Sequence, residues 1–251
     1  MRSARLKDPG RHAAGSTRSA LFSSYGPEKR GHRIANIRCQ AVLFDLDGVL
    51  VDSRRCIELV WETWARRHAF DPATVIRVAH GRRTSETLRE VAPHLDIPVE
   101  VAIFDKLEEV EHRGVEVVTG ARELLSVIPR TRWAVVTSGS PAVARLRLRL
   151  GHVPDPPVLI TAADVRRGKP DPEGYLQAAA ALGHSPAACV VLEDTPAGIA
   201  AGRAAGMTVL AVRGTYPDDR LTEAHAVVAS LASLRCRFLG ADGLEIEWGA
   251  T

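Results

Sequence analysis

Two aspartates separated by a single residue, Asp45 and Asp47, stand at the end of an apolar run and are followed by Gly48. Buried carboxylates in such a position are unfavourable unless a metal ion or a positive charge compensates them, so the pair is a candidate reaction centre. Asp and Gly are also ordinary turn residues after a strand. The rest of the chain must therefore distinguish a turn from a site.

Polar side chains also follow three later apolar runs, either directly or in the loop after the run. They are Thr137 and Ser138 after residues 133–136, Lys169 after residues 158–160, and Glu193 and Asp194 after residues 190–192. A glycine follows the two hydroxyls, and a glycine turn leaves backbone amides free to bind an anion. With Asp45 and Asp47, these positions supply carboxylates, hydroxyls and one ammonium, which favours a reaction site over a simple turn.

The elements that must position these residues alternate between strands and helices from residue 40 onward. Short runs rich in Val, Leu and Ile occur at 41–44, 133–136, 158–160, 190–192, 208–212 and 226–228. Continuous apolar runs of this length suit strands buried on both faces. Helical stretches lie between them, at 141–150, 172–182 and 196–205. The pattern predicts an α/β fold with a doubly wound parallel sheet and a Rossmann-like core, whose ligands bind at the carboxyl ends of the strands.

One interval interrupts this alternation directly after the first strand. Residues 54–118 contain no comparable apolar run, and Ile57, Val60, Trp61 and Trp64 follow helical spacing instead. A helical insertion at this place predicts a cap over the carboxyl ends of the strands. The expected domains are a catalytic core of residues 39–53 and 119–240, a cap of residues 54–118 and a C-terminal tail of residues 241–251.

The polar clusters, in this order, resemble the four motifs of the haloacid dehalogenase superfamily of phosphotransferases, over residues 40 to about 240. The resemblance lies in Asp-x-Asp-Gly at 45–48, Thr-Ser-Gly at 137–139, Gly-Lys-Pro at 168–170 and Glu-Asp-x-Pro-Ala-Gly-Ile at 193–199. Residues 80–84 and 160–165 are similar to those of sugar and polyol phosphate phosphatases with a helical cap. Thr119 and Thr195 depart from the usual pattern, at positions that carry no chemistry.

The resemblance implies a role for each motif residue. Asp45 would attack phosphorus and form an aspartyl-phosphate, which divides ester hydrolysis into two easier steps. Asp47 would protonate the leaving alkoxide and then activate water. Thr137, Ser138 and backbone amides around Gly48 would hold the phosphoryl oxygens, together with the side chain of Lys169.

The same resemblance implies Mg²⁺, because carboxylates that face a phosphate dianion require a hard cation with oxygen ligands. The implied ligands are the Asp45 side chain, the Asp47 backbone carbonyl and Asp194, with Glu193 as a direct or outer partner. Lys169 is the one lysine of the expected core domain in a chain with 29 arginines. A compact ammonium is not equivalent to a guanidinium in a tight phosphate site, which favours a functional role for this lysine.

In the cap, the similarity at residues 80–84 makes Arg82 and Arg83 candidate contacts to the substrate. An exposed charge at the start of a helix remains the alternative. Trp61, Trp64 and Trp133 are expected to pack in the core rather than to stack on a sugar. His80 is a further candidate for a substrate contact.

The net charge of +3 is unevenly distributed. Residues 1–38 hold nine Lys or Arg against two acidic residues, so the rest of the chain has 24 basic and 28 acidic residues. This acidic body predicts no nucleic-acid partner.

No apolar run approaches the roughly 20 residues of a membrane span, and four scattered cysteines indicate a cytoplasmic protein. The basic segment 1–38 is expected to be a disordered extension.

Three functions are compatible with the sequence. The leading one is a Mg²⁺-dependent phosphatase of a small phosphorylated sugar or polyol, working as a monomer or weak homodimer. A sugar phosphomutase similar to β-phosphoglucomutase shares every motif residue and differs in what accepts the phosphoryl group. A non-catalytic binding or regulatory protein on the same fold is disfavoured by the intact pair Asp45 and Asp47.

Overall fold

The computed structural model describes residues 34–79 and 81–249. Its central sheet has six parallel strands in the order β6-β5-β2-β7-β8-β9. In chain order they are β2 (Ala41–Phe44), β5 (Trp133–Val136), β6 (Leu159–Ile160), β7 (Cys189–Glu193), β8 (Thr208–Val212) and β9 (Ala226–Val228). The predicted doubly wound α/β core is confirmed, with strand β2 in the interior of the sheet.

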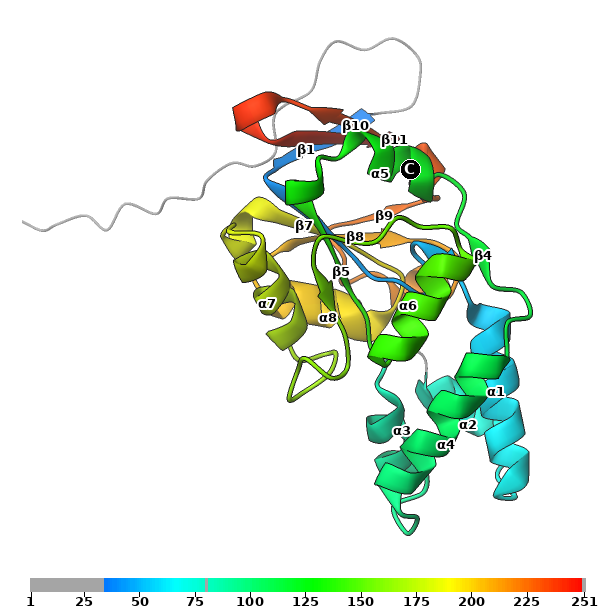
Figure 1. Cartoon of the computed structure of the whole chain (residues 1–251). Coiled ribbons are helices and arrows are strands. Elements are labelled where there is room, and N and C mark those ends of the chain that lie inside the picture. The colour runs from blue at the N-terminus through cyan, green and yellow to red at the C-terminus, as the bar shows by residue number, and fades with distance from the viewer. Residues whose placement is uncertain (1–33, 80, 250–251) are drawn as a thin grey trace, which may run out of the picture.

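Helices cover both faces of this sheet (Figure 1). They are α5 (Ala121–Val127), α6 (Pro141–Leu150), α7 (Glu173–Ala181) and α8 (Pro196–Ala204). Val42 and Phe44 of β2 pack in the cluster that includes α5 and α6, whereas Ala41 and Leu43 pack with α7 and α8. Both faces of β2 are thus buried, which explains why the strand is a continuous apolar run.

The predicted helical insertion is also confirmed, as four helices that form the lower part of the molecule in Figure 1. They are α1 (Arg54–Arg67), α2 (Pro72–Ala79), α3 (Thr84–Val91) and α4 (Ile97–Val110). The helices have a hydrophobic core of their own, which contains Trp61, Trp64 and Phe104. A short antiparallel pair, β3 (Val51–Asp52) with β4 (Glu116–Val117), connects this cap to the core. Trp61 and Trp64 therefore pack in the cap, as expected.

A second sheet corrects the expected chain ends. Strand β11 (Leu244–Gly249) lies between β1 (Ile34–Cys39) and β10 (Arg235–Phe238), and both pairings are antiparallel. The prediction of a tail at 241–251 is therefore wrong, and the expected extension 1–38 overlaps β1. Residues 1–33 of that extension lie outside the described residues.

The sequence of β11 explains the error. Leu244, Ile246 and Trp248 are buried against the core, while Glu245 and Glu247 lie on the other face and pair with Arg237. Such alternation is the pattern of a strand with one buried face.

Five short 3-10 turns complete the described chain, at Arg130–Arg132, Pro186–Ala188, Asp218–Arg220, Leu231–Ser233 and Gly240–Asp242. In the part of the chain described, no helix combines the length and the apolar character that crossing a membrane requires.

The burial of β11 predicts a measurable loss of stability when one of its side chains is shortened. Ile246 is fully buried, so Ile246→Ala should lower the free energy of unfolding by about 2–5 kcal/mol through lost burial and a residual cavity. Glu247→Ala on the opposite face should cost less than about 1 kcal/mol, since its ion pair is partly exposed. Urea unfolding of both variants tests this, and equal stabilities would contradict the packing of β11.

Candidate active site

A cleft lies between the cap and the carboxyl ends of the central strands. Its lining includes Asp45, Asp47, Thr137, Ser138 and Asp194 from the core, and Trp61, Arg82 and Glu108 from the cap. The parallel arrangement brings the ends of β2, β5 and β7 together, so side chains far apart in the sequence meet here. The cleft is the place that the polar strand ends predicted.

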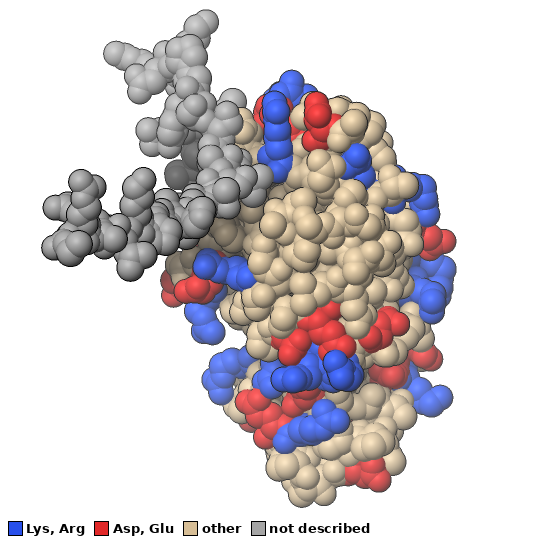
Figure 2. All heavy atoms as spheres, turned by 90° about the vertical axis from the view of Figure 1, so that its left-hand side faces the viewer, with Lys and Arg blue, Asp and Glu red and all other residues tan. Residues whose placement is uncertain are grey.

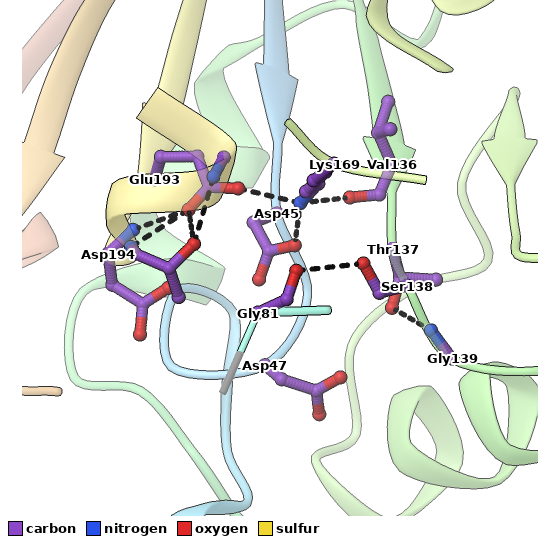
Figure 3. Close-up of polar contacts among 12 residues, drawn as sticks. Asp45, Asp47, Gly81, Val136, Thr137, Ser138, Gly139, Lys169, Glu193 and Asp194 are labelled. Carbon is purple, nitrogen blue, oxygen red and sulfur yellow. Dashed lines mark hydrogen bonds and ion pairs between the residues drawn. The ribbon is translucent and has the colours of Figure 1, made fainter. Parts of the chain in front are cut away.

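Asp45 is buried directly after β2, where its backbone amide donates to the carbonyl of Leu192 at 3.0 Å. Lys169 Nζ donates to Asp45 Oδ1, to Glu193 Oε1 at 2.6 Å and to the carbonyl of Val136 at 3.1 Å (Figure 3). Burial raises the pKa of Asp45 to about 7, although the nearby Lys169 ammonium opposes the shift. Burial by itself would lower the Lys169 pKa, but Asp45 and Glu193 raise it well above its usual value. Lys169 is thus a cation, held between two carboxylates.

Glu193 is fully buried and uses both oxygens in hydrogen bonds. Oε1 accepts from Lys169 and from the Tyr175 hydroxyl at 3.0 Å. Oε2 accepts from the backbone amides of Asp194 and Thr195 and from the Thr195 hydroxyl, at 2.9–3.0 Å. Gly198 permits this approach, because a Cβ there would fall 1.5 Å from Glu193 Oε1. Glu193 therefore orients its neighbours. Because both of its oxygens already accept hydrogen bonds, the contacts favour an outer partner of Mg²⁺ over a direct ligand.

Asp194 has the opposite character. It is buried, and neither carboxylate oxygen accepts a hydrogen bond of good geometry within the described residues. Burial and the charges of Glu193 and Asp45 raise its pKa well above the usual value, and a contribution from the Thr215 hydroxyl only partly offsets them. Gly48 leaves the space that this carboxylate occupies, since a Cβ there would lie 1.9 Å from Asp194 Oδ2. Such a carboxylate requires either a proton or a cation.

These residues fit a magnesium ion. Asp45 and Asp194 line the same cleft and contribute oxygen donors, to which the family resemblance adds the backbone carbonyl of Asp47. In residues 34–79 and 81–249, no three His, Cys, Asp or Glu side chains gather into a complete metal site. Mg²⁺ commonly keeps several water ligands and needs only one or two carboxylates from the protein, so two suffice.

Asp47 points away from the contact between Lys169 and Asp45 (Figure 3). Its Oδ1 accepts a hydrogen bond from the Ser53 hydroxyl at 2.5 Å, and its Oδ2 accepts one from Arg147 Nη1 at 2.8 Å. The side chain is 19% exposed and lines the cleft. Asp47 is thus placed beside the space for a substrate, with its carboxylate held on both oxygens.

Two hydroxyls follow β5 in the loop opposite Asp45. The Thr137 hydroxyl accepts from the amide of Gly139 at 3.1 Å, which forms the expected tight turn. The Ser138 hydroxyl donates to the carbonyl of Gly81 in the cap at 3.1 Å (Figure 3). Both residues line the cleft, so these two hydroxyls lie in the same cleft as Asp45 and Asp47.

Arg83 is not among the residues that line this cleft; Arg82 is, and it pairs with Glu90 at 2.5 Å. Arg83 donates instead to Glu86 and to the backbone carbonyls of Val165 and Arg166. Glu86 also accepts from the amide of Gly168, at 3.0 Å. Acidic and basic side chains gather where the cap meets the core on the face seen in Figure 2. The contacts place Arg83 in a link between the cap and the loop that carries Lys169, while His80 lies outside the described residues.

Several residues of the site were not found from the sequence: Ser53, Glu108, Arg147, Tyr175 and Thr215. One of them has a recognisable signal. Arg147 occupies the same face of α6 as Val143, Ala144 and Leu148, all of which are buried. A charged residue within the apolar stripe of a helix must have partners, and the spacing alone could have indicated this.

Comparisons with known proteins agree with this geometry. A family model described as haloacid dehalogenase-like hydrolase matches residues 39–206. Hexitol phosphatase A of Escherichia coli K12 is 42% identical over 203 residues, which cover 79% of this chain and 94% of the relative. Glycerol-1-phosphate phosphohydrolase 2 of Saccharomyces cerevisiae is 34% identical over 231 residues, with coverage of 85% and 91%.

Among solved structures, a HAD family hydrolase from Deinococcus radiodurans R1, with bound phosphate and sodium, superposes with a TM-score of 0.56. It is 28% identical, and the match covers 77% of this chain and 92% of that protein. The motifs at the strand ends, the helical cap and the match over residues 39–206 lead to one conclusion: the chain belongs to the haloacid dehalogenase-like hydrolase family.

Proposed function

We propose that this protein is a Mg²⁺-dependent phosphatase that hydrolyses the monophosphate ester of a small sugar or polyol. The observation that carries the proposal is the pairing of buried Asp45 with Lys169, beside the carboxylate of Asp194, which accepts no hydrogen bond of good geometry from the described residues. A buried carboxylate without a partner favours a bound cation, and an ammonium beside the nucleophile can compensate the charge of a bound phosphate. The relatives named for hexitol and glycerol phosphates support the substrate class.

The residues of the cleft divide the reaction between them. Asp45 attacks phosphorus, the bond to the ester oxygen breaks, and an aspartyl-phosphate forms on Asp45. Asp47 gives a proton to the departing alkoxide, and it later takes one from the water that attacks the aspartyl-phosphate. The second step releases inorganic phosphate and restores Asp45, so that atoms and charges balance over the cycle.

The other polar groups act on charge and orientation. Lys169 compensates the negative charge on Asp45 and on the phosphoryl group, and Glu193 holds the ammonium in place. Thr137 and Ser138 offer hydroxyls to the phosphoryl oxygens. Mg²⁺, bound by Asp45, Asp194 and the Asp47 carbonyl, would supply positive charge for the transferred phosphoryl group.

The part of the cleft provided by the cap suits a short carbon chain with hydroxyl groups. Ile57, Trp61 and Phe104 supply apolar surface, and Arg82 and the Thr84 hydroxyl supply a donor and an acceptor. This combination resembles the lining of small-molecule sites, where few polar groups among apolar walls fix the orientation of the ligand. A polyol contributes both the carbon backbone and the hydroxyls that such a wall can contact.

A panel of phosphate esters tests the proposed function. With Mg²⁺ present, we expect inorganic phosphate to appear in equal amount with the dephosphorylated product from sorbitol 6-phosphate, 2-deoxyglucose 6-phosphate or glycerol 1-phosphate. Phosphorus NMR follows substrate and product together, with nucleoside monophosphates as bulky controls that should react at least about tenfold more slowly. Conversion of glucose 1-phosphate into glucose 6-phosphate with little free phosphate would instead identify a mutase.

A further inference from the structure

Arg147, on helix α6 of the core, is more deeply buried than arginines usually are. Its side chain is 5% exposed, and its helical neighbours Val143, Ala144 and Leu148 are buried with it. A guanidinium cannot give up its charge in a protein, so its burial requires acidic partners within reach. The partners found here are Asp47 and Glu108.

The guanidinium bridges the two carboxylates through different nitrogens. Nη1 donates to Oδ2 of Asp47 at 2.8 Å, and Nη2 donates to Oε1 of Glu108. The other oxygen of Asp47 accepts from Ser53 at 2.5 Å, so its carboxylate cannot rotate without losing a hydrogen bond. A planar guanidinium imposes this orientation in a way that the single ammonium of a lysine cannot.

Glu108 links this arrangement to the cap. It lies on α4, which packs against α6, and its side chain is 7% exposed. Burial raises the pKa of Glu108, while Arg147 favours its ionised form. Arg147 therefore pairs with Glu108 of the cap and with Asp47 of the reaction centre.

We propose that Arg147 is the positioning residue for Asp47, and that Glu108 makes this positioning depend on the closed cap. The inference rests on the proposed function, since it needs Asp47 to protonate the leaving alkoxide. In the closed arrangement Arg147 is held from both sides and presents Asp47 to the cleft. Movement of α4 away from α6 removes Glu108 and releases that constraint.

The identity of the leaving group distinguishes this role from a purely structural one. An alkoxide is a poor leaving group and needs the proton of Asp47, whereas p-nitrophenolate leaves readily without one. The ratio kcat/KM reports only the steps up to formation of the aspartyl-phosphate, so the later attack of water does not affect it. Damage to the fold or to Asp45 would slow both kinds of ester alike.

The experiment compares kcat/KM for sorbitol 6-phosphate and p-nitrophenyl phosphate in Arg147→Met. We expect a fall of about 100-fold for the alkyl ester, as for a displaced catalytic group, and little change for the aryl ester. Arg149→Met is the matched control, because Arg149 is exposed on the same helix. In this variant kcat/KM for each of the two esters should stay at the wild-type level. If Arg147→Met does not fold, Arg147→Lys replaces it, with the same selective loss expected.

Glu108→Gln tests the link to the cap and keeps the shape of the side chain. It should lower kcat/KM for sorbitol 6-phosphate selectively, and it should add little in the Arg147→Met background if the two residues act as one unit. Equal losses on both esters, or additive effects in the double variant, overturn the inference. Wild-type protein that releases no phosphate from any sugar or polyol phosphate would refute the proposed function instead.

Discussion

Asp45→Asn should abolish phosphate release, with a fall in kcat of about 10⁴-fold or more, as for other enzymes that lose a nucleophile. The amide nearly preserves the shape of the side chain, but its nitrogen lone pair is delocalised and it cannot form the aspartyl-phosphate. Lys169 keeps its contact with Glu193 in the variant, so the ammonium is not left unpaired. Initial rates with sorbitol 6-phosphate, measured against the exposed variant Asp155→Asn, check the result.

A melting curve separates loss of chemistry from loss of fold. Burial raises the pKa of Asp45 to about 7, whereas in the unfolded chain it titrates near its ordinary value of 3.8. The folded protein therefore favours the neutral form, and the stabilisation this gives at low pH is lost as the pH rises through 7. A neutral asparagine avoids that loss, so without Mg²⁺ the variant should melt above wild type at pH 8 and close to it at pH 4. A variant that melts below wild type at pH 8 contradicts the assignment of Asp45 as a destabilised carboxylate.

The parts of the fold that could be predicted are those in which both faces of a strand are buried. Ala41–Phe44 is visible as an apolar run because helices cover it on two sides. Strand β11 (Leu244–Gly249) buries one face only, so its apolar residues alternate with glutamates and form no continuous run. Its partner β1 is separated from it by about 200 residues, so no local signal connects the two strands. Pairing of this kind depends on tertiary packing that a single sequence does not display.

The site shows the same division. Asp45 and Glu193 are found from the sequence because they end apolar runs, and Lys169 because it is the one lysine of the core domain; the structure brings the three into contact. Arg147 was missed because α6 carries three arginines, although only Arg147 has the spacing that places it on the buried face with Val143 and Leu148. Arg83 was predicted to contact the substrate because its loop is similar to that of sugar phosphate phosphatases. Its actual contacts depend on where Glu86 and the loop near Gly168 lie in space. Motifs at strand ends are fixed by the sheet, but contacts between the cap and the core depend on how two domains meet.

Removal of divalent cations should silence the enzyme as completely as the loss of Asp45. In the protein without metal, burial raises the pKa values of both Asp45 and Asp194, so protons compete with a cation for these oxygens. Below about pH 7 the concentration of Mg²⁺ needed for half-maximal rate should therefore rise, by up to tenfold per pH unit for one displaced proton. Chelation followed by titration with Mg²⁺ at pH 7.5 and pH 6 measures this dependence. Full activity in EDTA would contradict a metal requirement.

Two further measurements test the metal requirement: activity in the presence of Ca²⁺ and thermal unfolding in the presence of Mg²⁺. Ca²⁺ accepts more ligands at longer distances and should bind without restoring turnover. Mg²⁺ at 100 times its dissociation constant should stabilise the fold by about 2.7 kcal/mol, which for a chain of this size raises the Tm by about 5–10 °C. Asp194→Asn should lose most of this shift, whereas Asp155→Asn should keep it. Because this readout needs no turnover, an equal shift in the two variants would exclude Asp194 as a ligand even if both enzymes proved inactive for another reason.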